Sequence, residues 1–212
     1  RGGLGLFSLS LLAVLVLHQP AAADFESDWS QCNGKNADAA VAACSQIIQR
    51  RPIEAWKLGN AYNQRGLAYA NKADYDRAID DYTRAIYLNA GDAWPHNNRG
   101  VAYTHKRDYT RAMADFAKAI ELDHDNAWAY HNRAQAYAKQ GDHQRAIDDY
   151  TRSIQLDVNN AWAYNHRGQV YAAKHDYDRA IADFTTAIEH DPAYTWSYTN
   201  RGVAYASKRL YD

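Results

Sequence analysis

A seven-residue motif recurs along this chain at intervals of 34 residues. The copy at 97–103 reads Asn-Asn-Arg-Gly-Val-Ala-Tyr. Related heptads begin at Asn63, His131, Asn165 and Thr199. A fixed period of this length indicates a repeat array, in which each unit packs mainly on its neighbours. Functional residues are therefore expected on a surface that several repeats build together, and not in one central pocket.

Each 34-residue unit predicts two helices joined by a short polar turn, because apolar residues recur at helical spacing on both sides of that turn. The first helices are expected to end near Lys72, Lys106, Lys139 and Lys174. The second helices are expected over 76–88, 110–122, 144–156 and 178–190. No segment alternates with a period of two residues, so the predicted fold class is all-α.

Small residues recur where the two helices of a unit would meet. The first helices carry Gly66, Gly100, Ala134, Gly168 and Gly202, and the second helices carry Ala78, Ala112, Ala146 and Ala180. The second helices also present a large side chain at Tyr82, Phe116, Tyr150 and Phe184. A helical glycine costs roughly 0.5–1 kcal/mol, and burial of one large side chain, worth about 1.5–3 kcal/mol, outweighs that cost. We also expect a column of arginines to pair with carboxylates at Asp81, Asp115, Asp149 and Asp183; the column is Arg65, Arg99, Arg133, Arg167 and Arg201.

This pattern resembles the tetratricopeptide repeat. The resemblance covers 37–212 and implies a right-handed superhelical solenoid of antiparallel helix pairs. It places four repeats within 55–194, at about 59–92, 93–126, 127–160 and 161–194, with an incomplete first repeat in 24–54 and the start of a further repeat in 195–212. The amino-acid pattern within the repeats is similar to that of exported bacterial members of the family, such as those of alphaproteobacteria. The Ala55-Trp56 pair lies four residues early for the period, so the helix at 54–71 is expected to be one turn longer than its counterparts.

The first residues differ in kind from the repeats. Leu4 to Leu17 is an apolar run too short to span a bilayer comfortably, and small residues follow at Ala21 and Ala23. This pattern predicts a cleavable signal peptide over 1–23, and hence a periplasmic or secreted protein with no membrane contact after cleavage. A buried core helix or a retained membrane anchor is the alternative. The chain begins without Met and ends within a repeat, so we interpret it as a fragment truncated at both ends.

The chain has two cysteines, Cys32 and Cys44. An exported protein with an even cysteine count favours a disulfide between them, and two free buried thiols are the alternative. A zinc site would need further ligands nearby, so no metal is expected. Cys44 occupies the position that Tyr82 holds in the next repeat, facing the partner helix, and Cys32 falls where that partner helix would end. A Pro at position 52 marks the stop after this unit.

Polar residues on the first helices supply the candidate binding face, because these helices line the concave side of such a solenoid. An amide side chain offers one acceptor and two donors, which match the C=O and N–H of an extended peptide. The candidates are Asn63, Asn97, Asn98, His131, Asn132, Asn165 and Asn200. The resemblance adds support, since some family members hold peptides with an asparagine ladder. Simple solvation of an exposed helix face is the alternative. The tryptophans Trp94, Trp128, Trp162 and Trp196 are expected to pack between repeats.

The net charge of the chain and its lack of catalytic motifs limit the classes of function that we expect. The formal net charge is -1, which provides little of the basic surface that nucleic acids need. The chain shows no catalytic motif, no phosphate-binding glycine loop and no clustered metal ligands, so no cofactor is expected. Some family members bind chaperone tails with a clamp that requires lysines in the groove. Trp and Asn stand at the corresponding places here, so we do not expect such a clamp. We therefore predict a non-catalytic scaffold that binds an extended peptide or a partner protein. The alternatives are a substrate-recruiting region of an enzyme whose catalytic domain lies beyond residue 212, and a self-association module.

Overall fold

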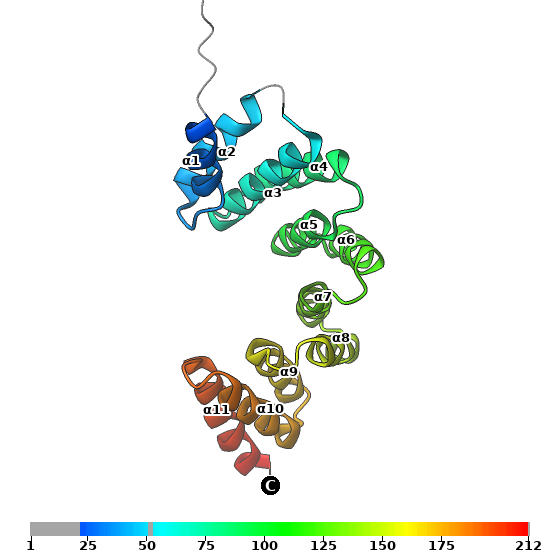
Figure 1. Cartoon of the computed structure of the whole chain (residues 1–212). Helices are drawn as coiled ribbons and strands as arrows, with labels where there is room; N and C mark the ends of the chain where they lie inside the picture. The colour runs from blue at the N-terminus through cyan, green and yellow to red at the C-terminus, as the bar shows by residue number, and fades with distance from the viewer. Residues whose placement is uncertain (1–21, 51–52, 212) are drawn as a thin grey trace, which may run out of the picture.

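The computed structural model describes residues 22–50 and 53–211, which form α-helices and no strands. The helices are α1 (Ala22–Cys32), α2 (Ala37–Gln49), α3 (Ala55–Asn71), α4 (Tyr75–Leu88), α5 (Ala93–His105), α6 (Tyr109–Leu122), α7 (Ala127–Gln140), α8 (His143–Leu156), α9 (Ala161–Ala173), α10 (Tyr177–His190) and α11 (Thr195–Tyr211). They stack in chain order into a curved array (Figure 1), with α5, α7 and α9 towards the concave side and α6 and α8 towards the convex side. The all-α solenoid is thus confirmed.

Short polar side chains decide where the helices begin. The carboxylate of Asp108 accepts a hydrogen bond from the backbone N–H of Arg111 at the start of α6, and an aspartate caps each of α4, α8 and α10 in the same way. Such caps satisfy backbone donors that the first helical turn leaves unpaired. The second helices, α4, α6, α8 and α10, therefore start one residue before the positions expected from the sequence. They end at the expected residues.

The glycines of the first helices are required by close packing. A Cβ atom added at Gly100 would lie 2.7 Å from Cε1 of Phe116, and one added at Gly66 would lie 2.6 Å from Cε1 of Tyr82. Both aromatic rings are buried. This confirms that a bare position on the first helix accommodates the large side chain of the second.

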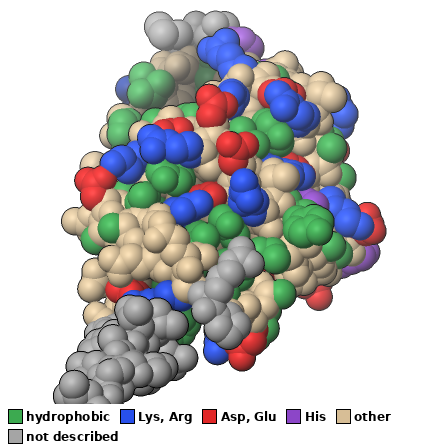
Figure 2. Space-filling view, turned by 90° about the horizontal axis from the view of Figure 1, so that it is seen from above, with side chains coloured by type: hydrophobic (Ala, Val, Ile, Leu, Met, Phe, Trp, Pro, Cys, Tyr) green, Lys and Arg blue, Asp and Glu red, His purple; other side chains and the backbone are tan. Residues whose placement is uncertain are grey.

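The first four arginines of the column behave as predicted, whereas Arg201 donates to Thr185 Oγ1. Each of the four guanidinium groups donates two hydrogen bonds to the carboxylate 16 residues later, in the pairs Arg65–Asp81, Arg99–Asp115, Arg133–Asp149 and Arg167–Asp183. Elsewhere, positive and negative side chains are interspersed over the face that Figure 2 shows, without a large patch of one sign.

The first unit departs from the others in two ways. Helix α3 has 17 residues where α5 has 13, which confirms the extra turn. Helices α1 and α2 form an additional antiparallel pair, and the Sγ atoms of Cys32 and Cys44 lie 2.04 Å apart, at disulfide-bonding distance. Residues 1–21 of the expected signal peptide and the expected stop at position 52 lie outside the described residues. None of the described helices has the length and hydropathy needed to cross a bilayer.

Candidate functional site

The amide side chains of the first helices are bonded mainly to one another. At three of the four joints between the first helices α3, α5, α7, α9 and α11, the Nδ2 of one asparagine donates to the Oδ1 of an asparagine in the preceding repeat at 3.0 Å. These bonds join Asn98 to Asn63, Asn132 to Asn97 and Asn200 to Asn165. The asparagines that the sequence predicts to hold a peptide backbone therefore bond to one another and hold neighbouring repeats in register.

This arrangement corrects the expected orientation of three candidates. Asn97, His131 and Asn165 retain only 3%, 1% and 0% of their accessible surface, so they do not project from the concave face. Asn97 and Asn165 each accept a hydrogen bond from an asparagine of the next repeat, and His131 contacts His166, so this column is enclosed between consecutive first helices. The other candidates, Asn63, Asn98, Asn132 and Asn200, keep part of their surface.

The tryptophans differ in part from the expectation: Trp128 meets Trp162 of the next repeat edge to face, but the indoles keep much of their surface. Trp94, Trp128 and Trp162 are 49%, 40% and 49% exposed. The neighbouring small side chains of Ala129 and Ala163 fill the space between repeats instead and are fully buried. The sequence signal for this exposed aromatic row is a tryptophan that recurs directly before a buried small residue, namely Pro95, Ala129 and Ala163.

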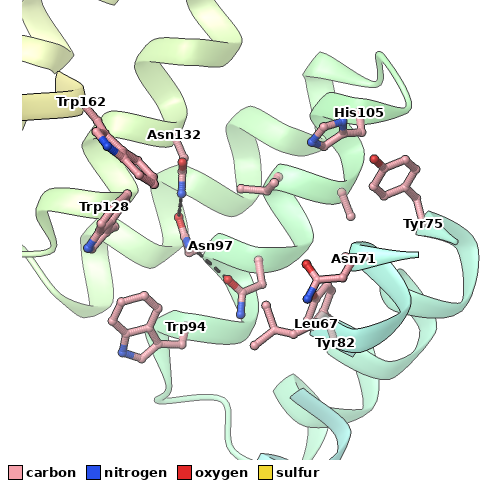
Figure 3. A pocket seen from close by; sticks show the side chains of 14 residues that line it. Leu67, Asn71, Tyr75, Tyr82, Trp94, Asn97, His105, Trp128, Asn132 and Trp162 are labelled. Atoms are coloured by element: carbon pink, nitrogen blue, oxygen red, sulfur yellow. Dashed lines mark hydrogen bonds between the residues drawn. The ribbon is translucent and has the colours of Figure 1, made fainter. Parts of the chain in front are cut away.

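The three indoles share one groove on the concave side. A depression of about 540 Å³ is lined by Trp94, Trp128, Trp162, Asn98 and Asn132, among others. Figure 3 shows the three indoles beside the hydrogen-bonded pair of Asn97 and Asn132. Leu67 lies on the side of Trp94 that is away from Trp128. The rings of Trp128 and Trp162 meet edge to face, with centroids 6.1 Å apart.

A second depression extends the groove towards the N-terminal helices. It measures about 450 Å³ and shares Trp94, Asn98 and Leu67 with the first. It also reaches Trp29 and Asn33 of the first helix pair. The two depressions together follow the concave side from α1 to α9.

The groove carries almost no charge. Among the described side chains that line the larger depression there is no Asp, Glu, Lys or Arg, and Asp92 is the one such residue in the smaller. Burial, with a smaller effect from the charge of Lys139, lowers the pKa of His105, so this ring is neutral at pH 7. In residues 22–50 and 53–211 no three His, Cys, Asp or Glu side chains are grouped to hold a metal ion.

Comparison with known families identifies the repeat. The profile described as "Tetratricopeptide repeat" matches residues 59–92, 127–160 and 161–194, and the related "TPR repeat" profile matches 103–141. Together these matches cover more than half of the chain. The chain belongs to the tetratricopeptide repeat family. Proteins of this family generally serve as protein-interaction scaffolds, and the fold is typically non-catalytic.

Solved tetratricopeptide repeat structures share this fold. MamA is 23% identical, with a TM-score of 0.62 over 74% of this chain and 89% of that chain. PilF of Pseudomonas aeruginosa is 18% identical, with a TM-score of 0.69 over 74% of this chain and 72% of that chain. YrrB, described as "a TPR protein with an unusual peptide-binding site", is 18% identical, with a TM-score of 0.63 over 86% of this chain and 92% of that chain. A search of curated proteins found no significant match.

Proposed function

We propose that this protein is a non-catalytic scaffold that binds an extended segment of a partner protein along its concave groove. The observation that carries the proposal is the exposed row of Trp94, Trp128 and Trp162 in one depression. Large exposed apolar surfaces in a groove are typical of binding sites, and tryptophan is enriched among the residues that dominate binding energy.

The asparagines support this groove in two ways. The bonds from Asn98 to Asn63 and from Asn132 to Asn97 hold consecutive first helices in register, and therefore fix the spacing of the indoles. The Oδ1 atom of Asn132 has no hydrogen-bond partner among the described residues, so it is available to a peptide N–H. We propose Asn63, Asn98, Asn132 and Asn200 as polar contacts for the ligand.

Peptide selection from a random display library, followed by titration calorimetry, tests the proposal. We expect Trp128→Ala to weaken binding of a selected peptide by at least 10-fold, since truncation of a central anchor typically costs about 2 kcal/mol or more. Trp56→Ala is the matched control, because Trp56 is exposed but lines neither depression. Equal affinity of the wild-type protein and Trp128→Ala for every selected peptide would rule out the groove.

We also propose that the protein is exported and that residues 1–23 are removed. The apolar run at 4–17, the small residues before Asp24 and the paired cysteines support this proposal. Expression with the natural leader, followed by fractionation and amino-terminal sequencing, tests it. The expected product starts at Asp24 outside the cytoplasm, and an uncleaved cytoplasmic chain would refute the proposal.

A further inference from the structure

The chemistry of the groove indicates which kind of segment it takes, an inference that rests on the proposed function. Its larger part is lined by indoles, amides and aliphatic side chains such as Leu67 and Val101. A charged side chain that entered it would lose hydration and find no counter-ion among the described lining residues. We infer that the groove selects a peptide segment whose inward-facing side chains are uncharged and apolar.

The geometry of the tryptophans favours a peptide over a neutral saccharide. Trp128 and Trp162 stand at 84° to each other, so they form a corner and not two coplanar platforms on which sugar rings could stack. An apolar side chain fits such a corner by touching one ring face and one ring edge. The nearby Asn132 Oδ1 can accept from a backbone N–H of the same segment.

Matched peptides test this ligand class on the whole chain. Octapeptides selected from a random library are expected to be rich in apolar residues, and replacing one inward-facing apolar residue with Glu or with Lys should weaken binding by at least 10-fold for either charge. Trp128→Ala and Trp162→Ala should lose the selected peptides, and Trp56→Ala should keep them. Preference for one charge, or competition by neutral oligosaccharides for the same tryptophans, would overturn the inference. Failure of all peptides to bind at the groove would instead overturn the proposed function.

An independent observation concerns one joint between repeats. Where three joints carry an asparagine pair, the joint between α7–α8 and α9–α10 carries His131 and His166 at the same two positions. Their ring centroids lie 5.1 Å apart at an angle of 62°. The Nδ1 atoms of both rings are buried and have no hydrogen-bond partner.

The surroundings of this histidine pair are neutral. His131 contacts the rings of Trp128 and Tyr150 and lies 3.1 Å from the amide nitrogen of Gln135, while Tyr150 of α8 also stacks on His166. The arginines at 133 on α7 and 167 on α9 are bound to carboxylates, and Asp149, beside Tyr150 on α8, is the carboxylate that Arg133 holds. Burial, and then the neighbouring His166, lower the pKa of His131 to about 3, and burial lowers the pKa of His166.

We propose that the His131–His166 joint is an acid-sensitive hinge in the array. Protonation of either ring places a charge beside a second imidazole with no carboxylate in contact, which loosens the packing of α9 on α7. The edge-to-face pair of Trp128 and Trp162 spans the same joint, so the groove is altered with it.

The direction of the pH effect follows from these pKa values. The unfolded histidines take up protons near pH 6.5, whereas the folded ones resist protonation. The joint therefore contributes its full stability above about pH 6.5, and that contribution is lost progressively as the pH falls towards 3. At pH 5, His131 alone should shift the unfolding equilibrium of this joint by about 30-fold.

The double variant His131→Asn, His166→Asn provides the matched control, because it rebuilds the asparagine pair of the other joints. Thermal unfolding at pH 7.5 and 5.0 should show a smaller acid destabilisation for the variant than for the wild type. Hydrogen-exchange protection in wild-type α7–α9 should fall more at pH 5.0 than protection in α3–α6. The same acid response in both proteins would overturn the proposal. Should the variant fail to fold, NMR titration of the wild-type imidazoles decides, and a His131 midpoint near pH 6.5 would refute the hinge.

Discussion

Arg99 donates two hydrogen bonds to the carboxylate of Asp115, from Nε to Oδ2 at 2.8 Å and from Nη2 to Oδ1 at 2.7 Å. Its remaining nitrogen, Nη1, donates to Thr83 Oγ1 in the preceding repeat at 2.9 Å. One half-buried guanidinium thus connects α5 to α6 within a repeat and to α4 of the repeat before. Bidentate pairs of this kind are among the stronger polar contacts in proteins.

Replacement of Asp115 by Ala should destabilise the array, because it leaves Arg99 partly buried without its carboxylate. We expect the free energy of unfolding to fall by about 3 kcal/mol, measured by urea denaturation. Asp76→Ala is the control, since Asp76 pairs with Lys106 in an exposed position. Its effect should stay within about 0.5 kcal/mol. Similar losses in the two variants would contradict this account.

The same pair predicts an acid response distinct from that of the histidines. Burial raises the pKa of Asp115, but the hydrogen bonds from Arg99 and His96 outweigh burial and hold the pKa below its ordinary value. The stability that this carboxylate contributes is therefore present above about pH 4 and lost as the pH falls further. Urea denaturation between pH 5 and pH 2.5 should show a larger loss of stability in the wild type than in Asp115→Asn.

Arg133 lacks the third bond that other members of its column make. The residue 16 positions earlier is Ala117, whereas Arg99 and Arg167 find Thr83 and Thr151 there. Ala117→Thr should supply the missing acceptor and raise the free energy of unfolding by about 1 kcal/mol, after subtraction of the lower helix propensity of threonine. Thr151→Ala should lower it by a similar amount. A destabilising Ala117→Thr combined with a neutral Thr151→Ala would contradict the prediction.

The turns inside the repeats require a left-handed residue after the first helix. Gly141 has φ of +82°, and the corresponding Ala73, Arg107 and His175 have φ of 57° to 62°. A side chain in this conformation costs roughly 1 kcal/mol relative to glycine. Arg107→Gly should therefore stabilise the protein by about 0.5–1 kcal/mol in thermal unfolding, and Gly141→Ala should destabilise it by about 1 kcal/mol. Opposite signs would show that the turn relaxes to another conformation.

The cysteine pair predicts a redox-dependent first unit. A bridge from Cys32 to Cys44 joins α1 to α2, which pack against the array on one side only. Reduction should lower the stability of this unit by about 2–4 kcal/mol, seen as faster hydrogen exchange in α1 and α2 and unchanged exchange in α7 and α8. The variant Cys32→Ala, Cys44→Ala should reproduce the reduced state. Full alkylation of both thiols in protein purified without reductant would show that no bridge forms.

Much of this architecture follows from the 34-residue period alone. The period repeats the neighbours of each residue, so a glycine at 100 and an aromatic ring at 116 are predicted to meet, and they do. The Arg99–Asp115 pair is predictable for the same reason. The extra turn of α3 follows from a four-residue shift in the Ala-Trp pair.

The orientation of the first helices was decided only by the tertiary structure. Asn97 and Trp94 lie on one helix and each belongs to a recurring column, so the sequence offers both as binding residues or packing residues. Close approach of consecutive first helices buries Asn97, where amides bond across the joint, and leaves the indole of Trp94 in the groove. Sequence therefore determined the helix pairs, their core and their internal ion pairs. Which polar and aromatic columns face the ligand depended on the rotation of one helix against the next, which local periodicity does not specify.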